Sequence, residues 1–430
     1  MMHVSNHDQA LRDYHRAARQ TIESALDGLR PPSPQLEASG SSRMVLVDRG
    51  DGALSWQDHD AAPIHPTVRE AMLSPSTLIE IPNEILGPNQ ILARLKTWDD
   101  RLTPNQGLRR WNPDDGTLNP IASVPAIEHP EEKPAGILLV IHGTFSTGDA
   151  IFEQLASIEH SSAFLNWASS RYEHILAFDH PTLSVSPILN GLDLARLFAD
   201  VNSPVDVICH SRGGLVTRWW LEAFGGAKIG PRRVVFVSSP LGGTSLASPS
   251  KIREAFDLFT TVGAHLKLAG SAASVFLPFT MVAVAMLQVF QVVTGSLAKT
   301  AASDLFFAAI PGLGSMSRVG NCGELERLRN HTHALPDYFA IRSDFRMQSA
   351  GWKFWKNFDE PGLRARQWGA DRVFSQENDL VVDNRSTSEI FDGQGLSPER
   401  IKHFASNGEI HHTNYFTHRE VTDAVRAFLA

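Results

Sequence analysis

Ser211 has the sequence surroundings of a nucleophilic serine. It follows a predicted strand at 205–209 and precedes Arg212 and Gly213, so a predicted strand gives way to a predicted helix at this residue. A serine on such a sharp turn needs small neighbours two residues away on each side, and these are Cys209 and Gly213. The alternative interpretation is that Ser211 only caps the helix. We interpret Cys209 as a small buried residue and not as a nucleophile.

The chain also offers an acid and a base for this serine. A serine hydroxyl is a poor nucleophile until a histidine takes its proton, and the histidine needs a carboxylate to hold its tautomer. Asp379 lies beside a short apolar run at 380–382, and His412 lies in a loop before the last predicted helix. The order Ser211, Asp379, His412 is that of the α/β-hydrolases and differs from the two other serine-hydrolase orders. The three residues are therefore predicted to form a catalytic triad.

A second turn predicts an oxyanion hole. Gly143 follows a predicted buried strand and His142, and it lets the backbone turn tightly across the strand end. The backbone N–H groups of Thr144 and Arg212 would then bind the oxyanion that forms when Ser211 attacks a carbonyl. The alternative is an ordinary turn at a strand end with a buried His142.

The elements that would position these residues alternate between strand and helix, which favours a mostly parallel sheet with helices on both faces. Ligands on such sheets bind outside the carboxyl ends of the strands, where the predicted site residues fall. The predicted strands are 136–141, 175–178, 205–209, 233–238, 338–341 and one near 373–374, and the predicted helices are 150–170, 189–200, 215–224 and 419–429.

The N-terminal part has a different pattern. An amphipathic helix is predicted at 11–29 and a polar linker at 34–42, which together make an N-terminal segment 1–42. Residues 43–130 are predicted to form a small, strand-rich accessory region. The α/β domain is then predicted to span 131–430.

Composition excludes several classes of protein. The 39 Lys and Arg against 47 Asp and Glu give a net charge of −8 without a polybasic run, so nucleic acid is not an expected partner. The two cysteines show neither a zinc-binding spacing nor enough residues for a disulfide scaffold. His331 and His333 have a ligand-like spacing, but no cysteine or carboxylate cluster completes a metal site, so we expect a solvated helix end there. No signal peptide is visible at the N-terminus, which favours a cytoplasmic protein.

From about residue 134 to the end, the sequence resembles lipase-type α/β-hydrolases. The similarity includes the branch of triacylglycerol lipases, lecithin–cholesterol acyltransferases and glycosylphosphatidylinositol deacylase-like proteins. Residues 1–130 match no family that we can name. The resemblance rests on the motifs at 142–143 (HG), 210–214 (HSRGG), 239–244 (SPLGGT), 378–382 (NDLVV) and 412–415 (HTNY).

This resemblance implies acyl-ester hydrolysis beneath a mobile lid, with neither a metal nor an organic cofactor. It favours His412 over the rival base His411, because the family places the base three residues before a tyrosine, here Tyr415. Asp383 and Asp344 are rival acids, of which Asp383 lies past the apolar run.

The insertion at about 250–320 carries an apolar segment. Residues 268–298 contain no formal charge, a length that could cross a bilayer. Pro278 and several polar residues favour two shorter helices instead. Three interpretations follow: a lid or cap over an acyl-chain site, a peripheral or spanning membrane contact, and an interface of a homo-oligomer.

The function predicted from the sequence is that of a serine ester hydrolase, a lipase or carboxylesterase, acting on a small-molecule acyl ester or lipid. A thioesterase, an acyltransferase or an amidase would use the same triad. A non-catalytic interaction or membrane-recruitment module on a hydrolase fold is the alternative from another class.

Overall fold

The computed structural model describes most of the predicted α/β domain. The described residues are 41–48, 54–58, 78–82, 88–128, 136–156, 162–225, 233–247, 310–317, 322–330, 336–346, 377–391 and 394–430. The chain divides into two units, one made of Met1–Arg94, Ser248–Ala309 and Arg346–Ser375, the other of Leu95–Ala247, Ile310–Phe345 and Gln376–Ala430. The predicted helix at 11–29, the strand near 373–374, the apolar segment 268–298 and the pair His331 and His333 lie outside the described residues.

In the first unit, the described residues form a three-stranded antiparallel sheet in the order β2-β1-β3. The strands are β1 (Ser41–Asp48), β2 (Leu54–Asp58) and β3 (Leu78–Pro82). The predicted linker at 34–42 therefore overlaps the start of β1.

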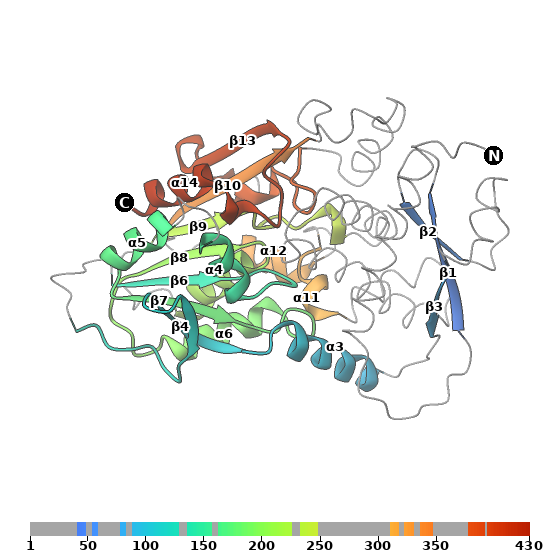
Figure 1. Ribbon diagram of the computed structural model, residues 1–430, viewed down its shortest axis with the longest axis horizontal. Helices are drawn as coiled ribbons and strands as arrows, with labels where there is room; N and C mark the ends of the chain where they lie inside the picture. The colour runs from blue at the N-terminus through green and yellow to red at the C-terminus, as the bar shows by residue number, and fades with distance from the viewer. Residues whose placement is uncertain are drawn as a thin grey trace, which may run out of the picture. The chain divides into compact units, whose positions relative to one another are not determined.

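The second unit contains an eight-stranded sheet in the order β13-β10-β9-β8-β6-β7-β4-β5. The strands from β13 to β7 run parallel to their neighbours, and β4 pairs antiparallel with both β7 and β5. Figure 1 shows β13 and β10 towards one edge and β4 towards the other. The strands are β4 (Gly107–Asn112), β5 (Thr117–Pro120), β6 (Ile137–Ile141), β7 (His174–Asp179), β8 (Val205–His210), β9 (Arg233–Val237), β10 (Asp337–Phe345) and β13 (Ile401–Asn407).

Helices cover both faces of this sheet, as the alternation of strands and helices predicted. Leu138 and Val140 of β6 pack in the core with residues of α4, α5 and α14, whereas Ile137 and Leu139 are buried but do not belong to that cluster. Because successive side chains of a strand point to opposite faces, the second set faces the other helix layer. The helices are α3 (Pro88–Leu102), α4 (Gly148–Ala156), α5 (Ser162–Arg171), α6 (Pro187–Leu197), α7 (Gly213–Arg218) with a π-helical continuation η1 (Trp219–Gly225), α11 (Pro311–Gly314), α12 (Gly323–Arg329) and α14 (Arg419–Leu429).

Short elements complete the described part of the second unit. They are the two-stranded sheet β11 (Glu389–Phe391) and β12 (Gln394–Gly395) and the 3-10 turns η2 (Ser245–Ala247), η6 (Ser386–Ser388), η7 (Pro398–Arg400) and η8 (Tyr415–Thr417).

The structure begins the α/β domain earlier than residue 131, the boundary predicted from the sequence. β4 and β5 belong to the main sheet although they fall in the predicted accessory region. Arg109 of β4 is buried and forms an ion pair with Asp179 at 2.9 Å and with Asp149 at 2.5 Å. A buried arginine interrupts the apolar pattern by which a strand is predicted, so β4 was not predicted as part of this sheet. Its ion pairs join residues far apart in the sequence and could not be predicted either.

Asp99 of α3 also ties this region to the sheet. Its buried carboxylate accepts hydrogen bonds from the backbone N–H groups of Thr182 (2.8 Å), Leu183 (2.9 Å) and Ser184 (2.7 Å) in the loop after β7. The loop packs against α11, because the N–H of Gly312 donates to the carbonyl of Leu183 at 3.0 Å. In the described part of the chain, no helix is both long and apolar enough to cross a membrane.

Candidate active site

Ser211 lies on a sharp turn between β8 and α7. Its φ of 53° falls in the left-handed region, which non-glycine residues rarely adopt. Its N–H donates to the carbonyl of Val237 on β9 at 3.0 Å, which fixes the strained backbone. A Cβ on Gly213 would lie 2.6 Å from the carbonyl oxygen of Ile141, so only glycine lets the chain pass this close to β6. The small residue expected at this position therefore has a steric cause.

The turn after β6 passes directly over Ser211. A Cβ on Gly143 would lie 2.6 Å from Cβ and 3.2 Å from Oγ of Ser211. Thr144, the predicted oxyanion donor, is the next residue and contacts Met316 through its hydroxyl. Arg212, the other predicted donor, is the N-cap of α7, and its buried side chain turns away to donate to the carbonyl of Val185. The backbone N–H groups of Thr144 and Arg212 thus belong to the two turns that meet at Ser211.

His142 supports the turn after β6 through its ring nitrogens. Its Nδ1–H donates to the carbonyl of Gly143 at 2.8 Å, and its Nε2 accepts the backbone N–H of His180 at 3.0 Å. Burial lowers the pKa of His142 and so favours the neutral ring, and the two hydrogen bonds fix its tautomer. The two rings are stacked with centroids 4.2 Å apart. His142 is therefore a fixed structural support for the turn.

Asp379 and His412 form a buried pair. The Nδ1–H of His412 donates to Oδ2 of Asp379 at 3.0 Å, and the N–H of His412 donates to the carbonyl of Asp379 at 3.1 Å. The N–H groups of Val381 and Val382 donate to Oδ1 of the same carboxylate at 3.2 and 2.9 Å. Burial raises the pKa of Asp379, but the charge of His412 and these hydrogen bonds outweigh it and leave the pKa below its ordinary value. The carboxylate is thus held ionised against the imidazole.

Two further hydroxyl groups contact this carboxylate. The hydroxyl of Tyr415 donates to Oδ2 of Asp379 at 3.0 Å, and the hydroxyl of Ser238 donates to the same oxygen. Tyr415 is the tyrosine of the loop motif that favoured His412 as the base. Ser238 was not singled out by the sequence analysis.

His210 links the turn of Ser211 to the loop of His412. It directly precedes Ser211, and its Nε2–H donates to the backbone carbonyl of His412 at 2.8 Å. The two imidazole rings lie 4.8 Å apart. Burial lowers the pKa of His210 to about 3, so the ring is neutral near pH 7. From the sequence, His210 was assigned only to the motif at 210–214, and its contact with the loop of His412 was not predicted.

The rival residues lie in other environments. His411 packs edge-on against Phe345, and its Nδ1 lies 3.3 Å from the hydroxyl of Thr413. Asp383 accepts hydrogen bonds from the N–H and the hydroxyl of Ser245 at 2.9 and 3.1 Å. Asp344 lies buried within β10. The structure therefore pairs His412 with Asp379, and it places His411 and Asp383 against other partners.

We expect thiol reagents to leave the native enzyme active. Cys209 is completely buried in β8, with its Sγ 3.6 Å from the carbonyl oxygen of Val235, and burial raises its pKa to about 12. A protonated, inaccessible thiol reacts slowly because the thiolate is the nucleophile. Ester turnover after iodoacetamide treatment, with mass spectrometry of the protein, measures this. Stoichiometric alkylation of Cys209 that removes the activity would contradict it, and Cys209→Ala should stay active.

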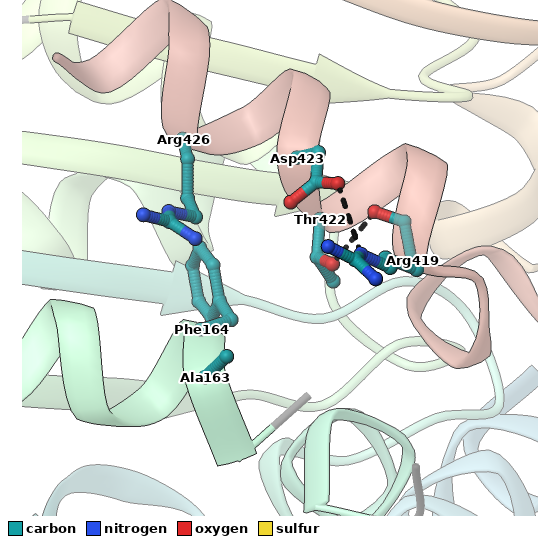
Figure 2. Close-up of a pocket in the computed structure, with 6 residues that line it drawn as sticks. All are labelled: Ala163, Phe164, Arg419, Thr422, Asp423 and Arg426. Atoms are coloured by element: carbon teal, nitrogen blue, oxygen red, sulfur yellow. Dashed lines mark hydrogen bonds and ion pairs between the residues drawn. The ribbon is translucent and has the colours of Figure 1, made fainter. Parts of the chain in front are cut away.

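A small cavity lies apart from these residues. It opens between α5 and α14, and Figure 2 shows the side chains of Arg419 and Arg426 at its wall. Arg419 forms an ion pair with Asp423 at 3.4 Å. None of the predicted catalytic residues lines this cavity. Within the residues that the structure describes, no group of three His, Cys, Asp or Glu side chains is arranged to hold a metal ion.

The mostly parallel eight-stranded sheet, the strained serine after β8 and the later aspartate and histidine are the arrangement of the α/β-hydrolase fold. Within this class, the chain belongs to the family described as "Domain of unknown function (DUF7379)", which it matches over residues 106–430.

Solved structures of hydrolases resemble the chain. The mature lipase BlEst2 of Bacillus licheniformis is 16% identical, with 71% of this chain and 96% of the lipase covered and a TM-score of 0.39. The esterase RhEst1 from Rhodococcus sp. ECU1013 is 14% identical, with coverage of 69% and 90% and a TM-score of 0.38. Lipase 1 from Pelosinus fermentans is 10% identical, with coverage of 68% and 98% and a TM-score of 0.37. A comparison with curated proteins found no match.

Proposed function

We propose that this protein is a serine ester hydrolase that cleaves acyl esters through Ser211, His412 and Asp379. The observation that carries the proposal is the buried His412–Asp379 pair, which His210 connects to the strained turn of Ser211. A histidine that donates Nδ1–H to a carboxylate keeps Nε2 free of a proton, and Nε2 can then accept the proton of a nucleophile.

The proposed reaction has two halves. Ser211 Oγ attacks the acyl carbonyl carbon while its proton passes to Nε2 of His412, and the ionised Asp379 stabilises the imidazolium. The N–H groups of Thr144 and Arg212 bind the oxyanion of the tetrahedral intermediate. The imidazolium then protonates the leaving alcohol, and an acyl-enzyme remains on Ser211. Water attacks the acyl-enzyme with His412 as the base, which releases the carboxylic acid and restores the serine.

The finer proposal is a lipase or carboxylesterase of the branch that the sequence motifs resemble. Its support is the motif set that surrounds the pair, including the tyrosine that reaches Asp379 from the loop of His412. We propose further that the insertion at about 250–320 acts as a lid, which favours a substrate with a substantial apolar acyl group. Met316, in the described end of this insertion, is buried, and its sulfur lies 3.7 Å from the hydroxyl of Thr144.

Labelling with a fluorophosphonate probe tests the class, and p-nitrophenyl esters of graded chain length test the substrate. We expect one label per chain, on Ser211, and turnover that rises with acyl length. The label should be found by peptide mass spectrometry and should be absent from Ser211→Ala. A folded wild-type protein that neither takes the label nor hydrolyses any ester would contradict the proposal. Faster turnover of thioesters or amides, or acyl transfer to an added alcohol in preference to water, would assign the same triad to another reaction.

A further inference from the structure

Ser238 has a backbone conformation that favours glycine. It follows β9 directly, and its φ of 48° lies in the left-handed region. Its N–H donates to the carbonyl of Ile341 on β10 at 2.9 Å, so the neighbouring strand holds the residue in this conformation. Glycine would adopt the same φ without the steric cost of a Cβ. A serine at this position therefore needs a reason that lies in its side chain.

The side chain of Ser238 lies between the acid and the base. Its hydroxyl donates to Oδ2 of Asp379, and its Oγ lies 2.9 Å from Nδ1 of His412. The hydroxyl of Ser238 has one proton, and this proton is used in the hydrogen bond to the carboxylate. The lone pairs of Oγ can therefore accept a hydrogen bond from the Nδ1–H of His412. This N–H consequently has two acceptors, Oγ of Ser238 and Oδ2 of Asp379.

We propose that Ser238 is a positioning residue of the catalytic triad, whose hydroxyl fixes Asp379 and His412 relative to each other. The inference rests on the proposed function and adds a residue that the sequence motifs do not include. The imidazole ring of His412 can rotate about its Cα–Cβ and Cβ–Cγ bonds. Oγ of Ser238, as a second acceptor of Nδ1–H beside the carboxylate, restricts that rotation. The ring of His412 is then held in one orientation throughout the reaction.

Tyr415 makes the role of Ser238 distinct. Its hydroxyl donates to Oδ2 of Asp379 at 3.0 Å, as Ser238 does, but the bond of Ser238 to Nδ1 of His412 has no counterpart at Tyr415 among the described contacts. Tyr415→Phe therefore removes one donor from the carboxylate and leaves both acceptors of Nδ1–H in place. Besides His412, the titratable groups that act on or contact Asp379 are Tyr415, His210 and His411.

The test compares Ser238→Gly and Ser238→Ala with the unmodified enzyme. Glycine removes the hydroxyl and relieves the backbone, whereas alanine removes the hydroxyl and keeps the strained φ. We expect both variants to lose about 10- to 100-fold in kcat with KM nearly unchanged, the effect of one hydrogen bond to a charged group. The control is Ser239→Ala, because the buried hydroxyl of Ser239 lies against Gly214. This control should keep the wild-type kcat.

The pH profile distinguishes positioning from packing. The hydrogen bond from Ser238 is one of the interactions that lower the pKa of Asp379. Its loss should raise that pKa, so the carboxyl signal of Asp379 in a carbon NMR titration should change at higher pH in both variants. A structural role alone would change stability without moving this titration.

A proton NMR measurement tests the same contact without substrate. The hydrogen-bonded Nδ1–H of His412, assigned by its loss in His412→Gln, should shift in Ser238→Gly and stay in place in Ser239→Ala. An unmoved signal in a folded Ser238→Gly variant would overturn the inference even if no ester were hydrolysed. An unchanged kcat, or a loss of kcat with an unmoved titration of Asp379, would overturn it as well. Wild-type protein without ester turnover would instead contradict the proposed function alone.

Discussion

Ser211→Ala should abolish ester turnover and fluorophosphonate labelling while the protein stays folded. The substitution removes only the hydroxyl from a turn whose backbone is fixed by its hydrogen bond to Val237. We expect residual turnover several orders of magnitude below wild type, because the remaining groups cannot form an acyl-enzyme. Steady-state kinetics and titration of the active site with the probe measure the loss, and circular dichroism verifies the fold.

His412→Ala should lose about as much activity as Ser211→Ala, and the double variant should lose little more, because the two residues act as one unit. His411→Ala is the matched control: it removes a buried imidazole from the same loop, but one that lies against Phe345. If His411→Ala were inactive and His412→Ala worked normally, the assignment of the base would be wrong.

Asp379→Asn should lower kcat by about 10⁴-fold, the size of the effect in the serine-protease triad. The amide N–H of asparagine can donate to Nδ1 of His412, where the carboxylate accepted the Nδ1–H. His412 then carries its proton on Nε2, and Nε2 cannot accept the proton of Ser211. The loss should appear in the acylation step, which stopped-flow measurement of the released p-nitrophenol follows.

The control for this change is Asp383→Asn. Asp383 is equally buried and lies four residues further on, but its carboxylate accepts from Ser245. We expect this variant to lose stability and to keep most of its kcat. A loss below about 10-fold in Asp379→Asn, or equal losses in both variants, would move the acid to another residue.

Much of the sheet could be predicted because its central strands are mostly apolar. β6 is apolar and buried at all five positions, and β8 and β9 are apolar except for Asp206 and His210 in β8 and Arg233 in β9, so their approximate bounds follow from the sequence pattern. β13 is mixed in burial along its length, and β4 carries arginines. These strands are defined by their partners in space, and their own residues do not identify them as strands.

The same limit applies to the site. Asp379 and His412 could be predicted because they lie in short motifs of the family that the sequence resembles. The turn of Ser211 could be predicted from its small neighbours Cys209 and Gly213. The contact of Ser238 with Asp379 joins residues 141 positions apart, and that of His210 with the carbonyl of His412 joins residues 202 positions apart. Neither residue lies in a pattern that predicts its partner, because such contacts arise only when the strands assemble.

The place of β4 beside β7 has a consequence for any shortened form of this protein. A chain that began at residue 131 would contain every predicted catalytic residue, yet β7 would lose the strand that covers its edge. The backbone N–H and C=O groups at the free edge of β7 could then form hydrogen bonds with another molecule, and such pairing commonly starts edge-to-edge aggregation. Asp179 would also lose the cation of Arg109. The strands β4 and β5 thus cover the edge of β7 and protect the domain against self-association, although they contain none of the predicted catalytic residues.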